Sequence, residues 1–318
     1  MENVGKIYGL TNDVVFKYVF GQRGNEKLSV CLLNALLGLE GADQLVGVTF
    51  LNPFSAKAYP TDRGSIVDVK VTDARGQLYF IEVQVATQSH FAVRAVYYGA
   101  KTFSDQLQAG HGFESLKKTT GISILDFTLF GDDLRVHSVY RLRDVEANRE
   151  LADTLELHFV ELDKVDFTKP RHRMTRFEKW MYVFRKSPLL AGGGELLPTE
   201  FSEDEELIMT IDQVKKVNAD AEMRSIIEGQ ERWEHDVASR LYDAHQAGIE
   251  KGREQGKAEG KAEGKAEGKA EGADEKAVAI AVSMINLGVD LQTLERGTGL
   301  SRSRLEELKN KLAGPKTL

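Results

Sequence analysis

The sequence predicts an α/β fold in which helices flank a mixed β-sheet, and three observations lead to this prediction. The segment from Ser65 to Ala86 contains two runs of β-branched and aromatic residues around a Gly-containing turn, which is typical of a β-hairpin. Around it, the expected elements follow in the order helix, strand, hairpin, helix, strand. Of the 318 residues, 42% are hydrophobic, which is ample for the core of such a fold.

The turn of the predicted hairpin determines which residues face each other across its two strands. A type I turn over residues 74–75, closed by Gly76 in the left-handed region, makes a three-residue loop. Counting back along both strands then places Asp68 opposite Glu82, with Gln84 on the same face. The alternate positions form an apolar face that consists of Val67, Val69, Val71, Ile81, Val83 and Val85.

Two carboxylates that face each other across a strand pair repel and destabilise it. A shared proton, the neighbouring Lys70 or a bound hard cation would relieve this repulsion, and Mg²⁺ is usually held by one or two carboxylates with waters and phosphate. The alternative is a solvated hairpin face with incidental charges. A different loop length would also shift the register and separate Asp68 from Glu82.

Before the hairpin, the sequence predicts helices at 10–21 and 25–37 and a strand at 46–51. Thr11 or Asn12 is suited to begin the first helix, because a short polar side chain can accept hydrogen bonds from the first turn.

After the hairpin, a helix is predicted at 91–109 and a strand at 121–130. Two further segments, 136–142 and 155–162, have the composition of strands that extend the same sheet.

Residues 169–186 contain the strongest basic cluster of the chain. Apolar side chains recur in it at helical spacing, at Phe177, Trp180, Met181 and Phe184. The candidate contacts to DNA phosphates are Arg171, Arg173, Arg176 and Lys179. The alternative is an amphipathic helix with buried aromatic residues and solvated cations, and both interpretations can hold on opposite faces.

The second half of the chain is polar and repetitive. A loop with Pro188 and glycines 192–194 leads into predicted helices from Ser202 to about 246, where Ser202 and Glu205 match a capping box. Glycine then recurs every four residues, mostly separated by Lys-Ala-Glu, at Gly248, Gly252, Gly256, Gly260, Gly264, Gly268 and Gly272.

The repeat has two interpretations. Each glycine costs a helix about 0.5–1 kcal/mol relative to alanine, and like charges four residues apart destabilise an isolated helix slightly. A semi-flexible spacer is therefore favoured over a helix whose glycine seam pairs with a second copy in a homo-oligomer.

The sequence of the tail, residues 274–318, indicates a small helical module of helix-turn-helix type. This module either contacts DNA or serves as a protein-interaction cap. The expected organisation has four parts. They are a first domain with the basic helix at 1–187, a helical extension at 188–247, a repeat spacer at 248–273 and the helical module at 274–318.

Composition excludes several classes of protein. The net charge of −7 argues against a generic polyanion-binding protein, so contact with nucleic acid requires a local basic patch. Cys31 is the sole cysteine, which excludes an internal disulfide and fits a reducing, cytoplasmic setting. There is no signal-peptide pattern and no apolar run near the roughly 18 residues of a membrane span, so no membrane association is expected.

The hairpin also resembles a known family. Asp68, followed by Glu82-Val83-Gln84, is similar to the D…(D/E)-x-K core of the PD-(D/E)XK nucleases, with glutamine in place of lysine. That variant resembles the recombination-promoting nuclease (Rpn) family, also described as PD-(D/E)XK family transposases. The segment 13–21 matches as well, and after the hairpin so do Phe91, Arg94, Tyr97 and Tyr98. The resemblance covers roughly residues 8 to 312.

The resemblance implies a restriction-endonuclease-like core of α-β-β-β-α-β order and a divalent-metal-dependent DNA endonuclease that promotes recombination or mobile-element transfer. Asp68 and Glu82 would hold Mg²⁺ or Mn²⁺, with the backbone carbonyl of Val83 as a further candidate ligand. The catalytic set would be Asp68, Glu82 and Gln84, whose amide can donate to and accept from a water or phosphate oxygen.

The candidate supporting residues are Asp13, Lys17, Lys70 and Arg94. Asp13 has a simpler interpretation as a favourable negative charge at a helix N-terminus. The alternative function is a non-catalytic protein that keeps the PD-(D/E)XK fold for oligomerisation or partner binding.

Overall fold

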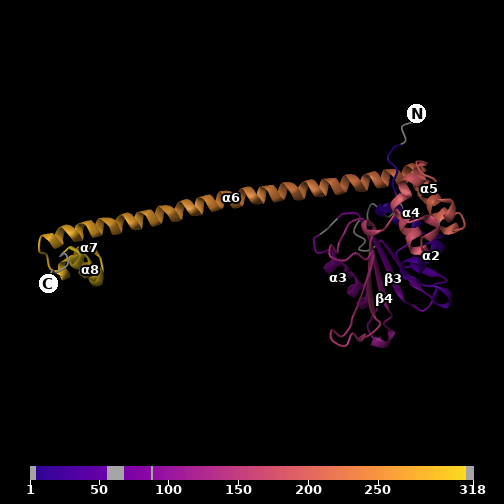
Figure 1. The fold of residues 1–318 in the computed structure, drawn as a ribbon, viewed down its shortest axis with the longest axis horizontal. Coiled ribbons are helices and arrows are strands. Elements are labelled where there is room, and N and C mark those ends of the chain that lie inside the picture. Colours follow the sequence, from indigo (N-terminus) through magenta and orange to yellow (C-terminus); the bar gives the residue numbers. More distant parts are fainter. Residues whose placement is uncertain (1–4, 56–67, 87–88, 313–318) are drawn as a thin grey trace. The chain divides into compact units, whose positions relative to one another are not determined.

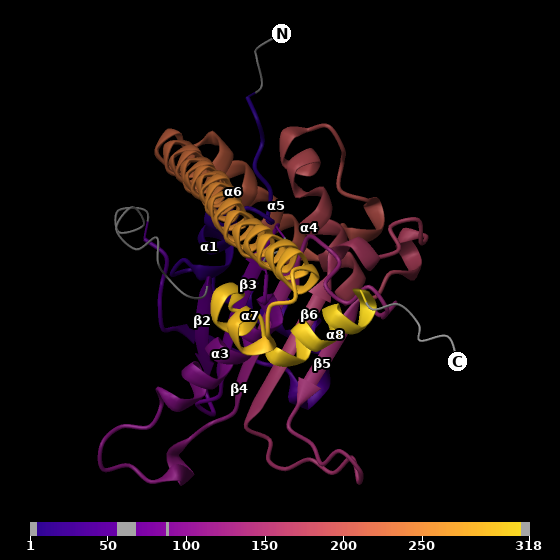
Figure 2. The same cartoon turned by 90° about the vertical axis from the view of Figure 1, so that its left-hand side faces the viewer.

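A six-stranded mixed sheet forms the centre of the first of two units in the computed structural model, which describes residues 5–55, 68–86 and 89–312 (Figure 1). The strand order is β1-β2-β3-β4-β6-β5, and Figure 2 shows the strands from a second direction. Their bounds are β1 Val48–Phe50, β2 Val69–Asp73, β3 Leu78–Gln84, β4 Thr119–Leu125, β5 His137–Arg141 and β6 Leu155–Glu161. Strands β3, β4 and β6 run parallel, and the other pairs are antiparallel.

The hairpin of β2 and β3 has the predicted loop and register. The Gly76 amide donates to the Asp73 carbonyl, and Gly76 has a φ of +80°. Val69 pairs with Ile81, so the next position outward places Asp68 opposite Glu82. The left-handed backbone at Gly76 is the conformation that the three-residue loop requires, which is why the turn chemistry predicted the register.

The predicted apolar face of the hairpin packs into the main core. Val69, Val71, Ile81 and Val83 are buried there together with Phe16 and other residues of the helices on that side. Val67 lies outside the described residues, and Val85 is exposed.

The opposite face is also covered, so the alternative of a solvated hairpin face is wrong. Phe80 lies on it, in a second cluster that includes Phe91 and Ala95 of helix α3, Phe91–Ser104. The sheet therefore separates two buried layers, and Glu82, on the Phe80 face, is buried as well.

Five helices follow from recognisable sequence signals. They are α1 Asp13–Gly21, α2 Glu26–Leu37, α3 Phe91–Ser104, α4 Arg176–Gly192 and α5 Glu205–Ala219. Asn12 caps α1 by accepting from the backbone amides of Val14 and Val15. Glycine 38 ends α2 in the left-handed conformation. Helix α3 ends five residues before the predicted 109.

Two local predictions around α4 and α5 are wrong. Pro188 lies inside α4 rather than in the following loop. Ser202 does not cap α5, because its hydroxyl donates to the Thr199 carbonyl at the end of a short 3₁₀ turn, and Asp204 occupies the N-cap position. The capping box with Glu205 is therefore absent.

Helix α6, Ala221–Asn286, runs without interruption through the glycine repeat, in contrast to the semi-flexible spacer favoured from the sequence. Its first turns bury Met223 and Ile227 in the core of the first unit. Lys, Ala and Glu, which fill three of every four repeat positions, are among the best helix formers, and this favours a continuous helix despite the glycines.

The second unit, Glu234–Leu318, ends in a small helical module. Helices α7 Leu291–Thr298 and α8 Arg302–Leu312 pack with the end of α6 around Ala281, Leu294, Leu300 and Leu305. The structure thus contains the predicted helical module, while the four-part domain division remains a prediction.

None of the helices in the described ranges combines the length and the apolar character that crossing a bilayer would require.

Candidate active site

Topology brings the predicted catalytic residues to one edge of the sheet. Strands β2 and β3 are antiparallel, so Asp68 before β2 lies at the same edge as Gln84 at the end of β3. Strand β4 is parallel to β3, so Asp126 after β4 reaches this edge too, where its backbone amide donates to the Gln84 carbonyl at 2.9 Å. Helix α1 adds its own polar residues, as described next.

Lys17 of α1 connects two carboxylates at this edge. Its Nζ lies 2.9 Å from Asp13 Oδ1 and 3.3 Å from Asp68 Oδ1. Asp68 Oδ2 also accepts a hydrogen bond from the backbone amide of Val83 at 2.8 Å. The Asp68 side chain is only 13% exposed, so these contacts fix it between the helix and both strands of the hairpin.

The charges of this group are strongly perturbed. Burial and the neighbouring Asp13 raise the pKa of Asp68 well above its ordinary value, although Lys17 and the Val83 amide oppose the rise. Burial lowers the pKa of Lys17, but Asp68 and Asp13 more than offset this, and the pKa of Lys17 is raised. Lys17 is therefore cationic at neutral pH, between two carboxylates that disfavour each other's ionisation.

Glu82 is the second buried carboxylate, with 6% of its surface exposed. The hydroxyl of Ser123, its register partner on β4, donates to Glu82 Oε1 at 2.9 Å. Burial raises the pKa of Glu82, although Ser123 and Arg94 oppose the rise. The Nη2 of Arg94 donates to Gln84 Oε1 at 3.1 Å, so α3 orients the residue that replaces the motif lysine.

The predicted supporting residues separate into two groups. Asp13, Lys17 and Arg94 lie at the site, through the contacts described above. Lys70 pairs in register with Phe80, and its backbone amide donates to Asn52 Oδ1. The cation that balances Asp68 in the structure is thus Lys17 and not the Lys70 considered from the sequence.

Three of the four predicted DNA-contacting residues already have partners within the chain. Arg171 donates to the carbonyls of residues 167 and 169 and stacks over the Tyr182 ring at 4.5 Å. Arg176 lies 3.6 Å from a carboxylate oxygen of Glu206, and Lys179 lies 2.6 Å from one of Asp204.

Arg173 is exposed and forms no ion pair within the described ranges. The aromatic side of this helix is core, as the sequence suggested, because Trp180, Met181 and Phe184 are buried. DNA contact by the cations remains a prediction.

Sequence reasoning missed Ser123 and an ion-pair network at the same edge. Arg185 of α4 donates to the carboxylates of Asp126 and Asp163, which follow β4 and β6. Burial raises the pKa of Asp126, and Arg185 opposes this rise. The signal for Ser123 was its alternation with apolar residues in β4, which marks a polar position on a buried strand.

The donor set fits a hard divalent cation. Asp68 and Glu82 supply carboxylate oxygens, as does Asp13, and both Asp68 and Glu82 are buried with raised pKa values. A cation would offset that unfavourable burial of negative charge. No cluster of three or more His, Cys, Asp or Glu residues suited to a metal occurs in the described part of the chain. Mg²⁺ does not require one, because waters and substrate phosphate complete its shell.

Comparison with known proteins gives one match. A family model described as PD-(D/E)XK nuclease family transposase matches residues 10–244, which include α1, the hairpin, α3 and the basic helix. Searches of curated proteins and of solved structures gave no significant match. The match ends before the glycine repeat, so the resemblance is confirmed to residue 244 rather than to 312.

Proposed function

We propose, because the chain belongs to the PD-(D/E)XK nuclease family transposases, that it is a divalent-metal-dependent DNA endonuclease that promotes recombination or mobile-element transfer. Family membership supports nuclease chemistry on DNA. The Rpn assignment, the metal and the role in recombination are the finer parts of this proposal.

The observation that carries the proposal is the pair of buried carboxylates, Asp68 and Glu82, next to Gln84 at one edge of the sheet. Burying carboxylates is unfavourable for the free protein, and a folding core has no need of them. A hydrolytic site does, because carboxylates of this kind can hold Mg²⁺ or Mn²⁺. Such an ion lowers the pKa of a water and stabilises negative charge on the scissile phosphate.

The chain's own groups have distinct roles in this proposal. Asp68 and Glu82 hold the ion, and the carbonyl of Val83 is a further candidate ligand. Gln84, oriented by Arg94, donates its amide N–H groups toward a phosphate oxygen or accepts from the attacking water.

Lys17 supplies the cation that the motif lysine would otherwise provide. Its ammonium is held beside Asp68 and remains charged at neutral pH, since its pKa is raised.

The test is nicking of supercoiled plasmid in Mg²⁺ or Mn²⁺, with chelator as the negative condition. Asp68→Asn and Glu82→Gln preserve side-chain shape, and Glu82→Gln can still accept from Ser123. Both variants should lose nicking while retaining the wild-type circular dichroism spectrum. Asp105→Asn, at an exposed carboxylate after α3, is the matched control and should nick normally.

The rival function is a non-catalytic scaffold that binds a partner or oligomerises through the repeat and tail. It predicts no metal-dependent nicking by the folded wild-type protein under any of these conditions. Nicking that persists in both site variants would instead identify a contaminating nuclease and remove support for this site.

A further inference from the structure

No contact or backbone conformation in the described part of the chain requires glycine at the repeat positions of α6. None of them has a positive φ, so left-handed backbone freedom does not explain them. A Cβ placed on any of the seven would meet no atom within 4 Å, so no neighbouring group in the described ranges requires their small size. A seam without side chains is useful when another backbone approaches closely, and that backbone must come from outside this helix.

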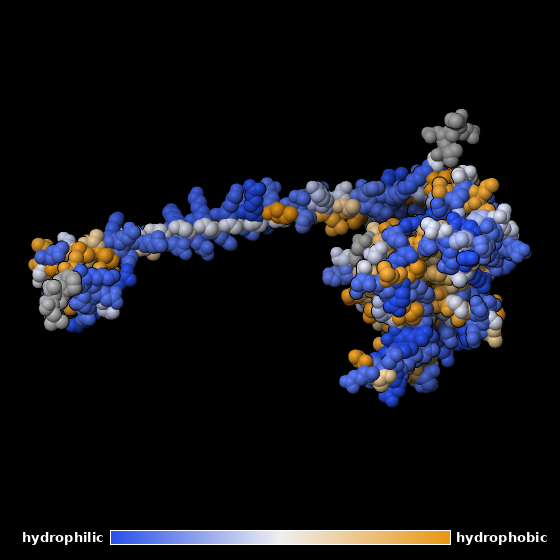
Figure 3. Space-filling view, viewed as in Figure 1, coloured by the Kyte–Doolittle hydropathy of each residue, from blue (hydrophilic) through white to orange (hydrophobic). Residues whose placement is uncertain are grey.

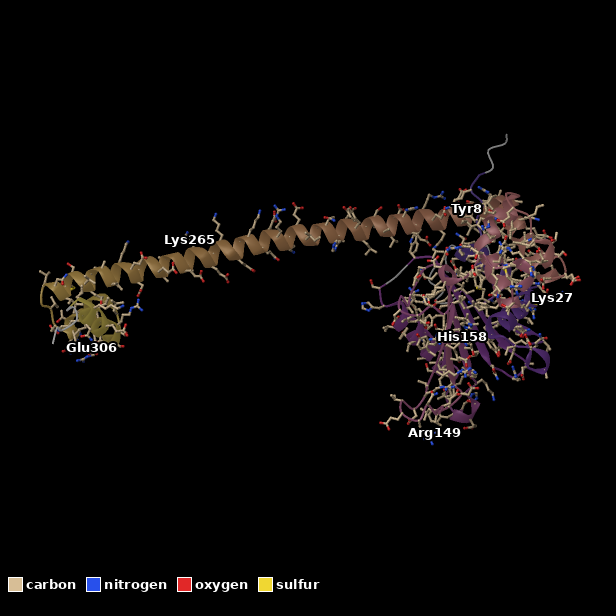
Figure 4. The ribbon with its side chains drawn as sticks, in the orientation of Figure 1. Tyr8, Lys27, Arg149, His158, Lys265 and Glu306 are labelled. Carbon is tan, nitrogen blue, oxygen red and sulfur yellow. The ribbon has the colours of Figure 1, made fainter. Side chains whose placement is uncertain are left out.

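The charges of the repeat are likewise unsatisfied within one helix. Lys257, Lys261, Lys265 and Lys269 each follow a glycine, and Glu259, Glu263, Glu267 and Glu271 each precede one. Residues two apart on a helix do not face each other, whereas residues four apart do. Among residues three or four positions away, the charged neighbours of each repeat lysine from 261 onward are lysines, and those of each repeat glutamate are acidic. Lys257, at the start of the repeat, also has Glu254 three residues before it. Lys265, labelled in Figure 4, projects from this exposed helix.

We propose that α6 pairs in parallel with α6 of a second copy of this chain, through the repeat. The glutamates lie on one flank of the glycine column and the lysines on the other. A two-fold axis parallel to the helices places the glutamate flank of one copy against the lysine flank of the other. The same holds if the alanine column faces the partner, because each alanine also lies between a lysine and a glutamate.

Charge complementarity favours a parallel second copy of the chain over an antiparallel copy and over DNA. In an antiparallel pair the symmetry axis is perpendicular to the helices, which sets lysine against lysine and glutamate against glutamate. DNA is disfavoured as the ligand of this segment, because its four lysines are balanced by four glutamates, which repel phosphates as strongly. A second copy matches both flanks at once, since each flank is complementary to the other.

Exposed apolar residues extend the proposed contact toward the start of α6. Leu241 is 67% exposed and lies seven residues, close to two turns, before Gly248, so both occupy nearly the same side of the helix. Figure 3 shows that the repeat itself is largely hydrophilic. Its pairing is therefore expected to depend on salt, because exposed ion pairs are screened.

The period of four also predicts the sense of the crossing. A four-residue column advances by about 40° per repeat on a helix of 3.6 residues per turn. A period longer than 3.6 leads to right-handed winding, so the two helices should cross in a right-handed sense and remain closest over a few repeats.

The first experiment measures the mass of the full-length protein by sedimentation equilibrium at low and high salt. The wild type should associate at low salt, and its dissociation constant should rise at least tenfold at high salt. The variant in which the four lysines become glutamate, K257E/K261E/K265E/K269E, should be monomeric, as should the reverse variant E259K/E263K/E267K/E271K. An equimolar mixture of the two variants should associate again.

Circular dichroism and the melting temperature of the first unit serve as folding controls for both variants. A wild-type protein that is monomeric at all salt concentrations overturns the proposal. The proposal is also overturned if the wild type and both charge variants associate to the same mass. It is likewise overturned if the protein associates only with a different protein and never with itself.

The second experiment determines orientation by disulfide formation in a Cys31→Ala background. Gly252→Cys and Gly268→Cys are made singly, with Ala258→Cys and Ala270→Cys as the matched pair on the opposite column. A parallel, in-register pair joins each position to itself, so at least one of the four single variants should form a disulfide-linked dimer. Both members of a set need not do so, because each column turns by about 40° per repeat. Cross-linking only between 252 and 268, or only between 258 and 270, when the variants are mixed indicates an antiparallel pair and refutes the proposal.

Discussion

At the scale of single residues, the candidate site places the carboxylates of Asp13, Asp68 and Glu82 beside the cations Lys17 and Arg94. Asp13 and Asp68 share one ammonium, that of Lys17, while Glu82 has the neutral hydroxyl of Ser123 as its hydrogen-bond donor and Arg94 nearby. Burial raises the pKa values of both Asp68 and Glu82, and the neighbouring Asp13 adds to the rise for Asp68. A bound divalent cation would compete directly with protons for these oxygens.

The first prediction follows from that competition. Mg²⁺ or Mn²⁺ should raise the melting temperature of the wild type by binding linkage, and Asp68→Asn should lose much of the gain. The folded-state pKa of Asp68 lies above 3.8, so its carboxyl retains a proton at a pH where a free aspartate has lost it. The gain should therefore be largest above this raised pKa and disappear as the pH falls through it.

Differential scanning fluorimetry at several pH values measures this gain, with Asp105→Asn as the exposed control. Equal metal stabilisation of the wild type and Asp68→Asn would rule out Asp68 as a ligand.

The second prediction concerns Gln84. Gln84→Ala should lower metal-dependent cleavage by about one to two orders of magnitude, the scale of a lost transition-state donor. Gln84→Lys restores the commoner motif but sets an ammonium against the Arg94 guanidinium, which now contacts the glutamine oxygen. This variant should gain activity when Arg94→Gln is added. Single-turnover plasmid nicking distinguishes the cases, and full activity in Gln84→Ala would show that the amide takes no part.

The third prediction assigns Ser123 as a positioning residue for Glu82. Ser123→Ala removes the hydroxyl that donates to a buried carboxylate, a loss on the order of 1–3 kcal/mol, and should raise the pKa of Glu82 further. The metal-induced rise in melting temperature should shrink accordingly.

Ser138→Ala is the matched control, because the Ser138 hydroxyl is buried on β5 and has no hydrogen-bond partner among the described residues. It should leave the metal response unchanged. If both variants reduced the response equally, Ser123 would be an ordinary packing residue.

At the scale of elements, turn and cap chemistry made the local structure predictable. The three-residue loop at Gly76 predicted the pairing that sets Asp68 against Glu82. Asn12, one of the two predicted caps, begins α1 at Asp13, three residues after the predicted start at 10. Ser202 shows the limit of such signals, because its hydroxyl donates to the Thr199 carbonyl in the preceding 3₁₀ turn and does not cap α5. The cover that α3 forms over the Glu82 face was not predictable either, since periodicity does not say which elements meet.

The site residues on the hairpin strands were predictable from the sequence, whereas the side chains that contact them were not. Residues 68, 82 and 84 could be placed together because they belong to one hairpin, whose loop determines the register of its two strands. The contacts of Lys17 with Asp68 and of Arg185 with Asp126 join segments that are distant in sequence. From the sequence alone, many other lysines and arginines were equally suitable partners for these two carboxylates. The same reason explains why the cations of the basic cluster, predicted to be solvated or on DNA, are largely paired with acids of the chain.

The fourth prediction belongs to the antiparallel pair of β5 and β6. His137 Nε2 lies 2.8 Å from His158 Nδ1, and His158 Nε2 lies 2.5 Å from Glu156 Oε1, a chain of contacts that includes the His158 labelled in Figure 4. Burial and His158 lower the pKa of His137 to about 4. The unfolded chain protonates this histidine near pH 6.5 and the folded chain does not, so stability is lost as the pH falls from 6.5 toward 4.

His137→Phe removes this titration and keeps a ring stacked on Phe177. Between pH 7 and pH 5 it should lose less stability than the wild type, by at most about 2 kcal/mol. Urea denaturation at the two pH values measures the difference, with the exposed His111→Phe as control. Parallel pH dependence in the wild type and His137→Phe would contradict the assignment.

At the scale of the whole molecule, the family match covers one part of the chain and the glycine repeat lies in another. Residues 10–244 match the nuclease family and contain the complete candidate site, whereas the repeat lies beyond the match. The seven repeat glycines in α6 would cost an isolated helix several kcal/mol. Pairing in parallel would offset that cost, and it would bring two nuclease units to the same end of the pair.

The last prediction follows from this division. A chain that ends before Gly248 keeps its site and its main core, so it should still nick plasmid DNA in Mg²⁺. Without the repeat it should no longer pair, and two cuts on opposite strands would then require two independent encounters. The ratio of linear to nicked plasmid at equal extents of cleavage should therefore fall in the truncated protein.

The full-length K257E/K261E/K265E/K269E variant separates pairing from the other roles of the tail, because it retains every residue after the repeat. It should show the same low ratio as the truncated chain. If it instead keeps the wild-type ratio while the truncated chain loses it, the tail module rather than pairing controls double-strand cutting. A folded truncated chain that cannot nick at all would mean that the repeat or tail completes the active unit itself.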